Sequence, residues 1–180
     1  MEFIIKYYNF IIAFIIVSSI IIGFLLSKKR HKYRIKKSKE ILKKIRSFKG
    51  ENIEKRIENY LIKIDPFTFE ELLLTLFEES GCKIKRNKRY TGDGGIDGKF
   101  IFNKKLFYIQ AKRYKNYIKK EDVLKFSKLC HDKKAYGVFI HTGKHSENVK
   151  NIENLSGKIR IIDKKELIDY ILNGNIKISN

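Results

Sequence analysis

Residues 91–114, TGDGGIDGKFIFNKKLFYIQAKRY, contain the pattern that decides the fold. A glycine-rich segment with two carboxylates precedes two short apolar runs, 100–102 and 106–109, which are separated by an Asn-Lys turn. Two such runs around a short turn are typical of a β-hairpin. Gln110 and Lys112 follow the second run. The hairpin is therefore predicted to bring acid, amide and amine side chains to one end of a sheet.

The side chains at this end of the hairpin suit the hydrolysis of a phosphodiester. That reaction needs a metal ion that binds phosphate oxygen, an oriented water and neutralisation of the leaving oxygen. Asp97 offers a carboxylate and Gln110 an amide oxygen, which are ligands that Mg²⁺ accepts. Lys112 lies two residues beyond Gln110 and so projects from the same face. The Gly94-Gly95 pair lets a phosphate approach the backbone, because glycine has no Cβ. An ordinary solvated sheet face with the same residue types is the alternative.

Other polar residues near the hairpin have plainer explanations. Asp93, within a Gly-Asp-Gly-Gly turn, is more often a turn-former than a metal ligand. Arg113 and Lys144 are candidate DNA contacts, and Arg113 is equally consistent with an ordinary surface position. His141 and His145 could act as a base, but surface or capping histidines are the favoured interpretation.

The charge of the chain points to a polyanionic partner. Lys and Arg number 40 against 20 Asp and Glu, a net charge of +20. Residues 28–50 contain 12 basic residues and one acid (+11), whereas residues 51–180 contain 27 and 18 (+9). Nucleic acid and an anionic membrane surface both fit such an excess. Each basic residue near headgroups contributes about 1 kcal/mol. A compositional bias toward Lys, Ile and Asn remains an alternative explanation.

An apolar segment precedes the basic one. Residues 7–26 contain no charged side chain, and these 20 positions would span about 30 Å as a helix, the thickness of a bilayer core. Lys6 alone lies in front, and a cluster of basic residues follows, which predicts that the body of the protein is cytoplasmic. A signal peptide would have basic residues in front, and a buried core helix is the other alternative. We expect a single-pass anchor at residues 1–27 in the cell inner (cytoplasmic) membrane.

The rest of the chain divides into a stalk and a domain. A basic helical stalk is predicted at 28–64, and the Asp65-Pro66 pair interrupts its pattern and opens a domain at 65–180. Within the domain we predict, in order, a helix at 69–80, strands at 82–86, 100–102 and 106–109, a helix at 119–128, a strand at 135–140, a helix at 144–154, a strand at 159–162 and a helix at 164–172. This order predicts an α/β fold with a mixed sheet flanked by helices.

The first helix of the domain carries one further candidate acid. Thr68 is a plausible N-cap, and Glu71 completes a capping box. On the helical wheel Glu70 borders the apolar face, whereas Glu71 points toward water. Glu70 is therefore the acid of this helix that we expect to reach the site.

Three motifs together resemble the Mrr catalytic domain. They are Phe69-Glu70-x-Leu72, the run GDGGIDG at 92–98, and QAKRY at 110–114. The Mrr domain belongs to a type IV restriction endonuclease family in the PD-(D/E)xK nuclease superfamily, and the resemblance covers about residues 65–172. It implies a restriction-endonuclease-like mixed sheet flanked by helices, here preceded by the N-terminal transmembrane helix.

The resemblance also implies residue roles. Asp97 would be the metal-binding acid, Gln110 would take the place usually held by Glu, and Lys112 would be the catalytic lysine. Glu70 would be the helix acid of the family, and the main-chain carbonyl of Ala111 would complete the metal shell.

Two departures from the family pattern limit what carries over. The strand at 135–140 is followed by His141-Thr142-Gly143, where the family typically has Thr-Thr-Gly. Mrr-type enzymes that recognise modified DNA usually have a separate winged-helix domain, whereas here a predicted anchor and stalk precede the catalytic domain. Specificity for modified bases is therefore not expected to carry over.

The leading hypothesis is a membrane-anchored, Mg²⁺-dependent DNA endonuclease that acts in restriction of foreign double-stranded DNA. A homodimer is plausible, because two active sites are needed to cut both strands. The main alternative is a non-catalytic DNA-binding or membrane-adaptor module, since the neutral amide of Gln110 binds a cation more weakly than a carboxylate does. A junction-resolving nuclease of the same superfamily is a narrower alternative.

Overall fold

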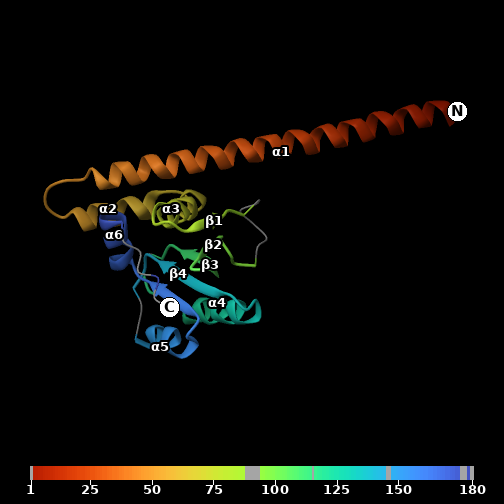
Figure 1. The fold of residues 1–180 in the computed structure, drawn as a ribbon. Coiled ribbons are helices and arrows are strands. Elements are labelled where there is room, and N and C mark those ends of the chain that lie inside the picture. Colours follow the sequence, from red (N-terminus) through yellow and green to blue (C-terminus); the bar gives the residue numbers. More distant parts are fainter. Residues whose placement is uncertain (1, 88–93, 115, 145–146, 175–177, 179–180) are drawn as a thin grey trace.

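The domain is built on a five-stranded mixed sheet (Figure 1). The computed structural model describes residues 2–87, 94–114, 116–144, 147–174 and 178, so Asp93 and His145 lie outside the described residues. The strands are β1 (Lys83–Lys85), β2 (Gly98–Phe102), β3 (Lys105–Lys112), β4 (Tyr136–His141) and β5 (Ile159–Ile162). The helices are α1 (Glu2–Arg46), α2 (Ile53–Lys63), α3 (Pro66–Glu79), α4 (Lys120–Asp132), α5 (Glu147–Ser156) and α6 (Lys164–Asn173). The element order predicted from the sequence is confirmed.

The predicted hairpin is formed by β2 and β3. The two strands pair antiparallel, with Gly98 opposite Ile109 at the open end. Asn103 and Lys104 form the turn with positive φ angles of 47° and 63°. A two-residue turn of this kind matches the twist of the flanking strands.

The sheet continues from β3 in the parallel sense. β3 pairs with β4 and β4 pairs with β5, both in parallel, and Lys112 lies opposite His141. The carboxyl ends of β3 and β4 therefore meet at the same edge of the sheet. This is the edge at which the open end of the hairpin lies.

Helices cover both faces of the sheet (Figure 1). α3 and α6 pack on one face, and α4 and α5 pack on the other. Alternation along β3 sends Phe107 and Ile109 into the first cluster of buried side chains and Tyr108 into the second. On the first face the rings of Phe77 and Phe100 stack with their centroids 4.6 Å apart.

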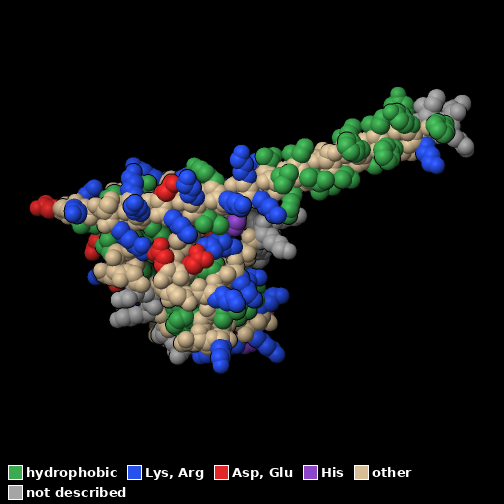
Figure 2. All heavy atoms as spheres, turned by 45° about the horizontal axis from the view of Figure 1, so that its top comes forward, with side chains coloured by type: hydrophobic (Ala, Val, Ile, Leu, Met, Phe, Trp, Pro, Cys, Tyr) green, Lys and Arg blue, Asp and Glu red, His purple; other side chains and the backbone are tan. Residues whose placement is uncertain are grey.

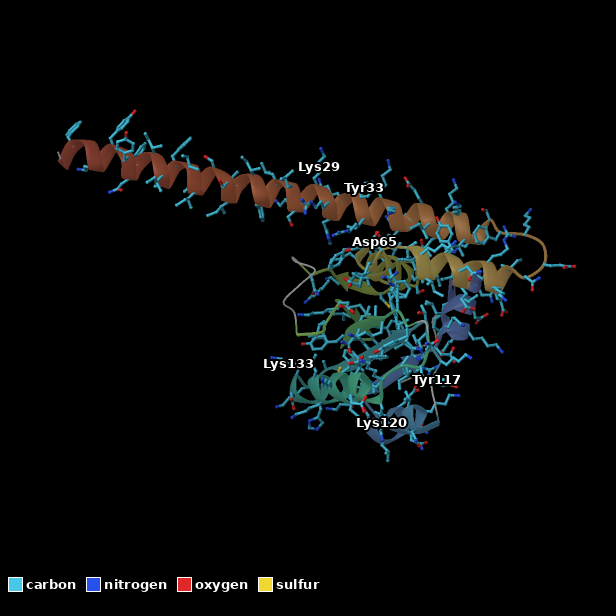
Figure 3. The ribbon with its side chains drawn as sticks, turned by 180° about the vertical axis from the view of Figure 1, so that it is seen from behind. Lys29, Tyr33, Asp65, Tyr117, Lys120 and Lys133 are labelled. Atoms are coloured by element: carbon cyan, nitrogen blue, oxygen red, sulfur yellow. The ribbon has the colours of Figure 1, made fainter. Side chains whose placement is uncertain are left out.

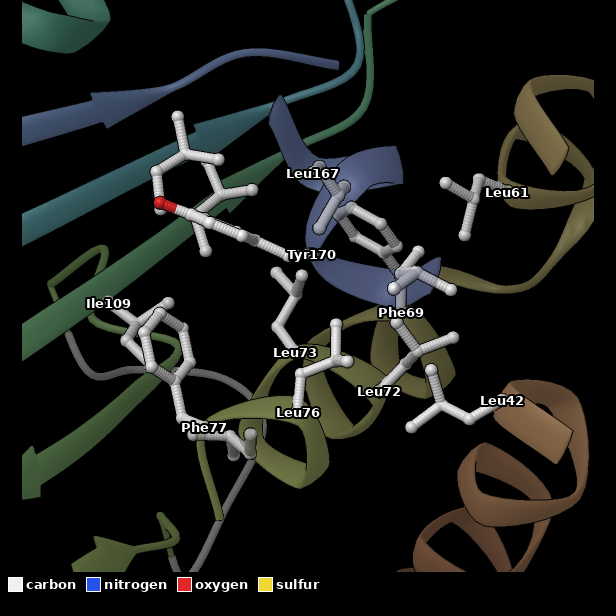
Figure 4. Packing of buried hydrophobic residues seen from close by; sticks show 14 of the residues in the cluster. Leu42, Leu61, Phe69, Leu72, Leu73, Leu76, Phe77, Ile109, Leu167 and Tyr170 are labelled. Carbon is white, nitrogen blue, oxygen red and sulfur yellow. The ribbon is translucent and has the colours of Figure 1, made fainter. Parts of the chain in front are cut away.

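The second half of α1 is part of the core. Ile41, Leu42 and Ile45 are buried in the same cluster as α3 and α6 (Figure 4). The hydroxyl groups of Ser38 and Thr75 lie 3.0 Å apart in a buried hydrogen bond between α1 and α3. The segment predicted as a stalk at 28–64 therefore forms two helices, α1 and α2, that pack onto the domain.

The first half of α1 extends away from the domain and is apolar (Figures 1 and 2). It contains a stretch long and apolar enough to cross a membrane, and none of the most apolar window is buried. The aliphatic and aromatic side chains between residues 10 and 26 are exposed. By length and composition α1 is thus a candidate span.

Two details of α3 differ from the sequence prediction. The N-cap is Asp65, whose side chain accepts a hydrogen bond of 3.0 Å from the Thr68 N–H. The helix therefore begins at Pro66, a residue suited to the first turn because its missing N–H is not needed there. Glu71 is only 1% exposed rather than facing water, because α1 covers that side of α3. It accepts a 3.0 Å hydrogen bond from Arg86.

Candidate active site

Two carboxyl groups from distant parts of the chain lie close together at the open end of the hairpin. Glu70 is the fifth residue of α3, and Asp97 immediately precedes β2. Burial and then the charge of Asp97 raise the pKa of Glu70 to about 8. An effect of this kind is expected when a second carboxylate lies near the first. The helical wheel predicts Glu70 at the border of the core, and the structure places it beside the hairpin.

The Asp97 carboxylate is held in place by the second strand. The Asp97 N–H donates a 2.8 Å hydrogen bond to the Ile109 carbonyl, and its Oδ2 accepts one of 2.7 Å from the Ala111 N–H. The side chain thus extends the β2–β3 ladder by one hydrogen bond. This fixes the position of the carboxylate relative to β3.

Gln110 lies against the glycine turn. A Cβ built on Gly95 would lie 2.8 Å from Gln110 Nε2, so a larger residue at position 95 would displace the amide. Gly95 has a φ of 89°, which also favours glycine. Gly94 is exposed, and nothing would lie within 4 Å of a Cβ there. The Oε1 atom of Gln110 is buried without a hydrogen-bond partner among the residues that the structure describes.

Lys112 stands at the end of β3. It follows Gln110 by two residues, and the two pair with Phe139 and His141 on β4. Among the described residues no ion pair or hydrogen bond of the half-buried Lys112 amine is present. His141 is fully buried, so the interpretation of His141 as a surface residue is wrong. Its Nδ1 lies 3.1 Å from the Gly143 carbonyl oxygen, consistent with a capping role.

The remaining predicted contacts are distributed along the same edge. The Arg113 guanidinium donates to the carbonyls of Ile62 and Ile64, where α2 ends, which gives it a structural partner. Thr142 Oγ1 bonds the backbone of Tyr114 at 3.1 Å and so joins the segments that follow β3 and β4. Lys144 is exposed in the segment after β4, which leaves its amine accessible to a ligand.

One neighbour of the site was not predicted as a site residue. Arg34 of α1 acts on Glu70, whose pKa its charge lowers in opposition to the larger raising effects. The guanidinium lies 4.5 Å from the centre of the Phe67 ring at the start of α3. The sequence signal for this residue is its helical spacing from Arg30 and Lys37, at i−4 and i+3.

The donor set fits a hard divalent cation. Mg²⁺ binds oxygen ligands, usually one or two carboxylates with water. Glu70 and Asp97 repel each other in the absence of a cation, and the buried Oε1 of Gln110 has no described partner. A cation bound by the two carboxyl groups would favour the ionised form of Glu70, and a cation could also take the amide oxygen as a ligand. Within the described residues no group of three His, Cys, Asp or Glu side chains forms a metal cluster, so such a site would depend on the amide and on backbone oxygen.

The family follows from a comparison of the chain with known families. The catalytic domain of Mrr, described as a restriction endonuclease, matches residues 61–171. The chain belongs to this Mrr restriction endonuclease family. The match begins within α2 and contains the hairpin, Glu70 and every strand of the described sheet. No curated protein matches the chain.

Two solved structures share the fold of the Mrr domain. MspJI restriction endonuclease, in complex with a 27-mer oligonucleotide, superposes with a TM-score of 0.51 at 22% identity, covering 67% of this chain and 31% of that one. The DNA modification-dependent restriction endonuclease AspBHI superposes with a TM-score of 0.54 at 16% identity, covering 71% and 37%. The chain thus spans about a third of each neighbour. These likenesses confirm the predicted restriction-endonuclease-like sheet.

Proposed function

We propose that this protein is a Mg²⁺-dependent DNA endonuclease that acts in restriction and is anchored in the cytoplasmic membrane by α1. The observation that carries the proposal is that Asp97, whose charge acts on Glu70, is hydrogen-bonded to the Ala111 N–H of β3, the residue after Gln110 with its buried amide oxygen. The Mrr family and the shared fold of two restriction endonucleases support a nuclease with DNA as its substrate.

Each side chain has a distinct role in this proposal. Asp97 and Gln110 bind the cation together with the carbonyl of Ala111, and Glu70 holds the cation or its water. Bound Mg²⁺ would supply Lewis-acid stabilisation of the phosphate and lower the pKa of a water. Lys112 orients the attacking water or offsets negative charge with its amine.

The glycine turn and the edge of the sheet provide access for the substrate. Among the described residues no atom lies within 4 Å of a Cβ built on Gly94, so on that side a phosphate can approach the backbone. Lys144, exposed after β4, is a further phosphate contact in the proposal. Arg113 supports the site through the end of α2 rather than through the DNA.

The anchor is supported by the composition of α1. An apolar stretch is followed by basic residues from Lys28 onward, as in a helix whose carboxyl end remains in the cytoplasm. The catalytic domain would then lie on the cytoplasmic side, directly below the membrane surface.

The proposal is tested by nicking of supercoiled plasmid. The full chain, in nanodiscs of zwitterionic lipid, should nick plasmid with Mg²⁺ and not with EDTA. Asp97→Ala should lower the rate by at least about 100-fold, since it removes both a cation ligand and the bond to Ala111. Asp132→Ala, at the exposed end of α4, is the matched control and should be as active as the wild type. Equal rates for wild type and Asp97→Ala would contradict the assignment.

A second candidate is a non-catalytic DNA-binding module. The amide at position 110 favours it, because a neutral ligand binds a cation more weakly than a carboxylate does. It predicts duplex binding that survives Asp97→Ala, with no cleavage under any divalent metal. Cleavage by the wild type but not by Asp97→Ala would favour the nuclease, and binding without cleavage by either would favour the DNA-binding module.

A further inference from the structure

One side of α1 lies over the start of α3, the helix that carries Glu70. Arg30, Arg34 and Lys37 follow one another at spacings of four and three residues, which places their side chains on one face of the helix. Asp65, at the start of α3, lies directly beneath this part of α1 (Figure 3). We call these three cations the site-side stripe.

Two members of the stripe contact the end of α3 that carries Glu70. Arg34 Nε lies 4.0 Å from Asp65 Oδ1, and its guanidinium lies over Phe67. Lys37 Nζ lies 3.4 Å from Asp65 Oδ2. These two cations contact the same acid, Asp65.

The third member has no such compensation. Arg30 is exposed and forms no ion pair or hydrogen bond within the described part of the chain. The sequence between positions 28 and 39 contains eight Lys or Arg and no acid. Figure 2 shows these basic side chains on the part of α1 that lies over the domain. The stripe thus continues the positive charge from the site toward the apolar half of α1.

The stripe is held in a fixed position relative to the site. Three observations fix the helix that carries it: the Ser38–Thr75 hydrogen bond of 3.0 Å, and the burial of Leu42 and of Ile45. A helix with such packing does not move as a tail does, so its cations keep their distance from Glu70.

We propose that the site-side stripe binds the phosphates of one DNA strand and guides the duplex into the active site. The proposal rests on the nuclease function proposed above. From position 30 to 37 the helix rises about 10 Å, over which one DNA strand presents about three phosphates. Three cations are therefore matched to three phosphates. Lipid headgroups are the competing ligand, but a headgroup partner does not require that Arg34 and Lys37 contact the start of the helix that carries Glu70.

The same helix offers a control set of equal charge. Lys29, Lys36 and Lys43 are exposed and lie on the opposite side from the core contacts. At about 100° per residue they project roughly 100–140° away from the stripe. Replacing them changes the charge of the helix equally without touching the face toward the site.

The experiment measures binding of a fluorescent 30-base-pair duplex to the full chain in zwitterionic nanodiscs, with EDTA to prevent cleavage. Arg30→Glu is compared with Lys29→Glu, and the triple Gln variant of the stripe with the triple Gln variant of the control set. Anisotropy titrations at several salt concentrations give the slope of log K against log salt. Thermal unfolding of each variant checks that it folds, and the Arg30→Glu substitution removes no ion pair or hydrogen bond of the described residues.

The stripe variants should bind DNA more weakly, with a salt slope smaller by about 0.9 for each phosphate that the helix no longer neutralises. The control variants should keep the wild-type slope. Equal DNA binding by the stripe variants and the control variants would contradict the proposed role of the stripe and leave the nuclease proposal intact. Normal duplex binding by Arg30→Glu with reduced affinity for anionic nanodiscs would instead assign the stripe to lipid. If the wild type binds no duplex, the proposed function fails, and the stripe fails with it.

Discussion

Glu70 and Asp97 lie 27 positions apart in the sequence, and in the fold the charge of Asp97 acts on the Glu70 carboxyl group. Burial of a carboxyl group opposes its ionisation, and a second carboxylate nearby adds to that penalty. A pair of acids in this arrangement is costly to ionise without a cation. Raised pKa values of this type are common where carboxylates bind metals or move protons.

The first prediction concerns proton release. Burial and then Asp97 raise the pKa of Glu70 to about 8, so at pH 7 this carboxyl is mostly protonated. A cation favours the ionised form, and Mg²⁺ binding at pH 7 should release close to one proton. Calorimetric titration with Mg²⁺ in two buffers of different ionisation enthalpy measures the number of protons released. Glu70→Gln should remove this release, whereas Glu54→Gln, exposed on α2, should retain it.

The pH dependence of stability gives a second readout for the same carboxyl. The pKa of Glu70 rises from 4.5 to about 8, so the folded state binds more protons between these values. Without metal the free energy of unfolding should therefore decrease as the pH rises through that window. Glu70→Gln should flatten the decrease. An identical pH profile in wild type and Glu70→Gln would count against the raised pKa.

The position of Glu70 at the border of the core could be predicted from the sequence, and the burial of its neighbour Glu71 could not. The wheel of α3 puts Glu70 at the border of the apolar face, and its side chain is partly buried in the structure, whereas the prediction that Glu71 points toward water is wrong. Glu71 is buried because α1 lies on it and Arg86 pairs with it, and both arrangements depend on tertiary packing. The prediction of Thr68 as the cap is wrong for a related reason, since Asp65 and Thr68 both fit the local pattern of a helix start.

α1 combines two environments in one helix. Its first half is apolar and exposed, and its second half contributes Ile41, Leu42 and Ile45 to the core. The contribution of the second half to the core was hard to predict from the sequence, because the few apolar positions that pack on α3 lie among many Lys and Arg residues. The hairpin, by contrast, was predictable in detail, since strand periodicity and the Asn103-Lys104 turn are local signals.

The second prediction tests α1 as a core element. Leu42 is 1% exposed and packs among α3 side chains, so Leu42→Ala should lower the free energy of unfolding by about 2–5 kcal/mol. Lys43→Ala, the exposed next residue, should change it by less than about 0.5 kcal/mol. Urea unfolding of the full chain in detergent, monitored by the near-ultraviolet signal of the domain tyrosines, provides the comparison. Indistinguishable midpoints for the two variants would mean that α1 does not stabilise the domain.

The layers of the molecule place the candidate site near the apolar half of α1. Arg34, which acts on Glu70, follows the last residue of the predicted span, Leu26, by eight positions. Eight helical residues rise about 12 Å. In an inserted protein the active site would therefore lie close beneath the headgroups.

The third prediction concerns location. The full chain expressed in a bacterium should sediment with membranes and resist extraction by alkaline carbonate, because about 30 Å of apolar helix inserts stably. A tag at the C-terminus should be accessible only after the cells are opened, since the basic residues keep the domain inside. A variant in which Ile12, Ile16 and Ile20 are changed to Lys should lose membrane association. Recovery of the wild type in the soluble fraction would contradict the anchor.

Residues 24–49 contain neither glycine nor proline, and α1 runs unbroken from its apolar half into the core of the domain. A helix without a hinge is a rigid connection and not a flexible linker. If α1 anchors the protein as proposed, this helix would hold the domain at a fixed distance from the membrane surface, and the site would reach only DNA close to that surface. Under that arrangement, selection between DNA molecules would follow from how close each one comes to the membrane.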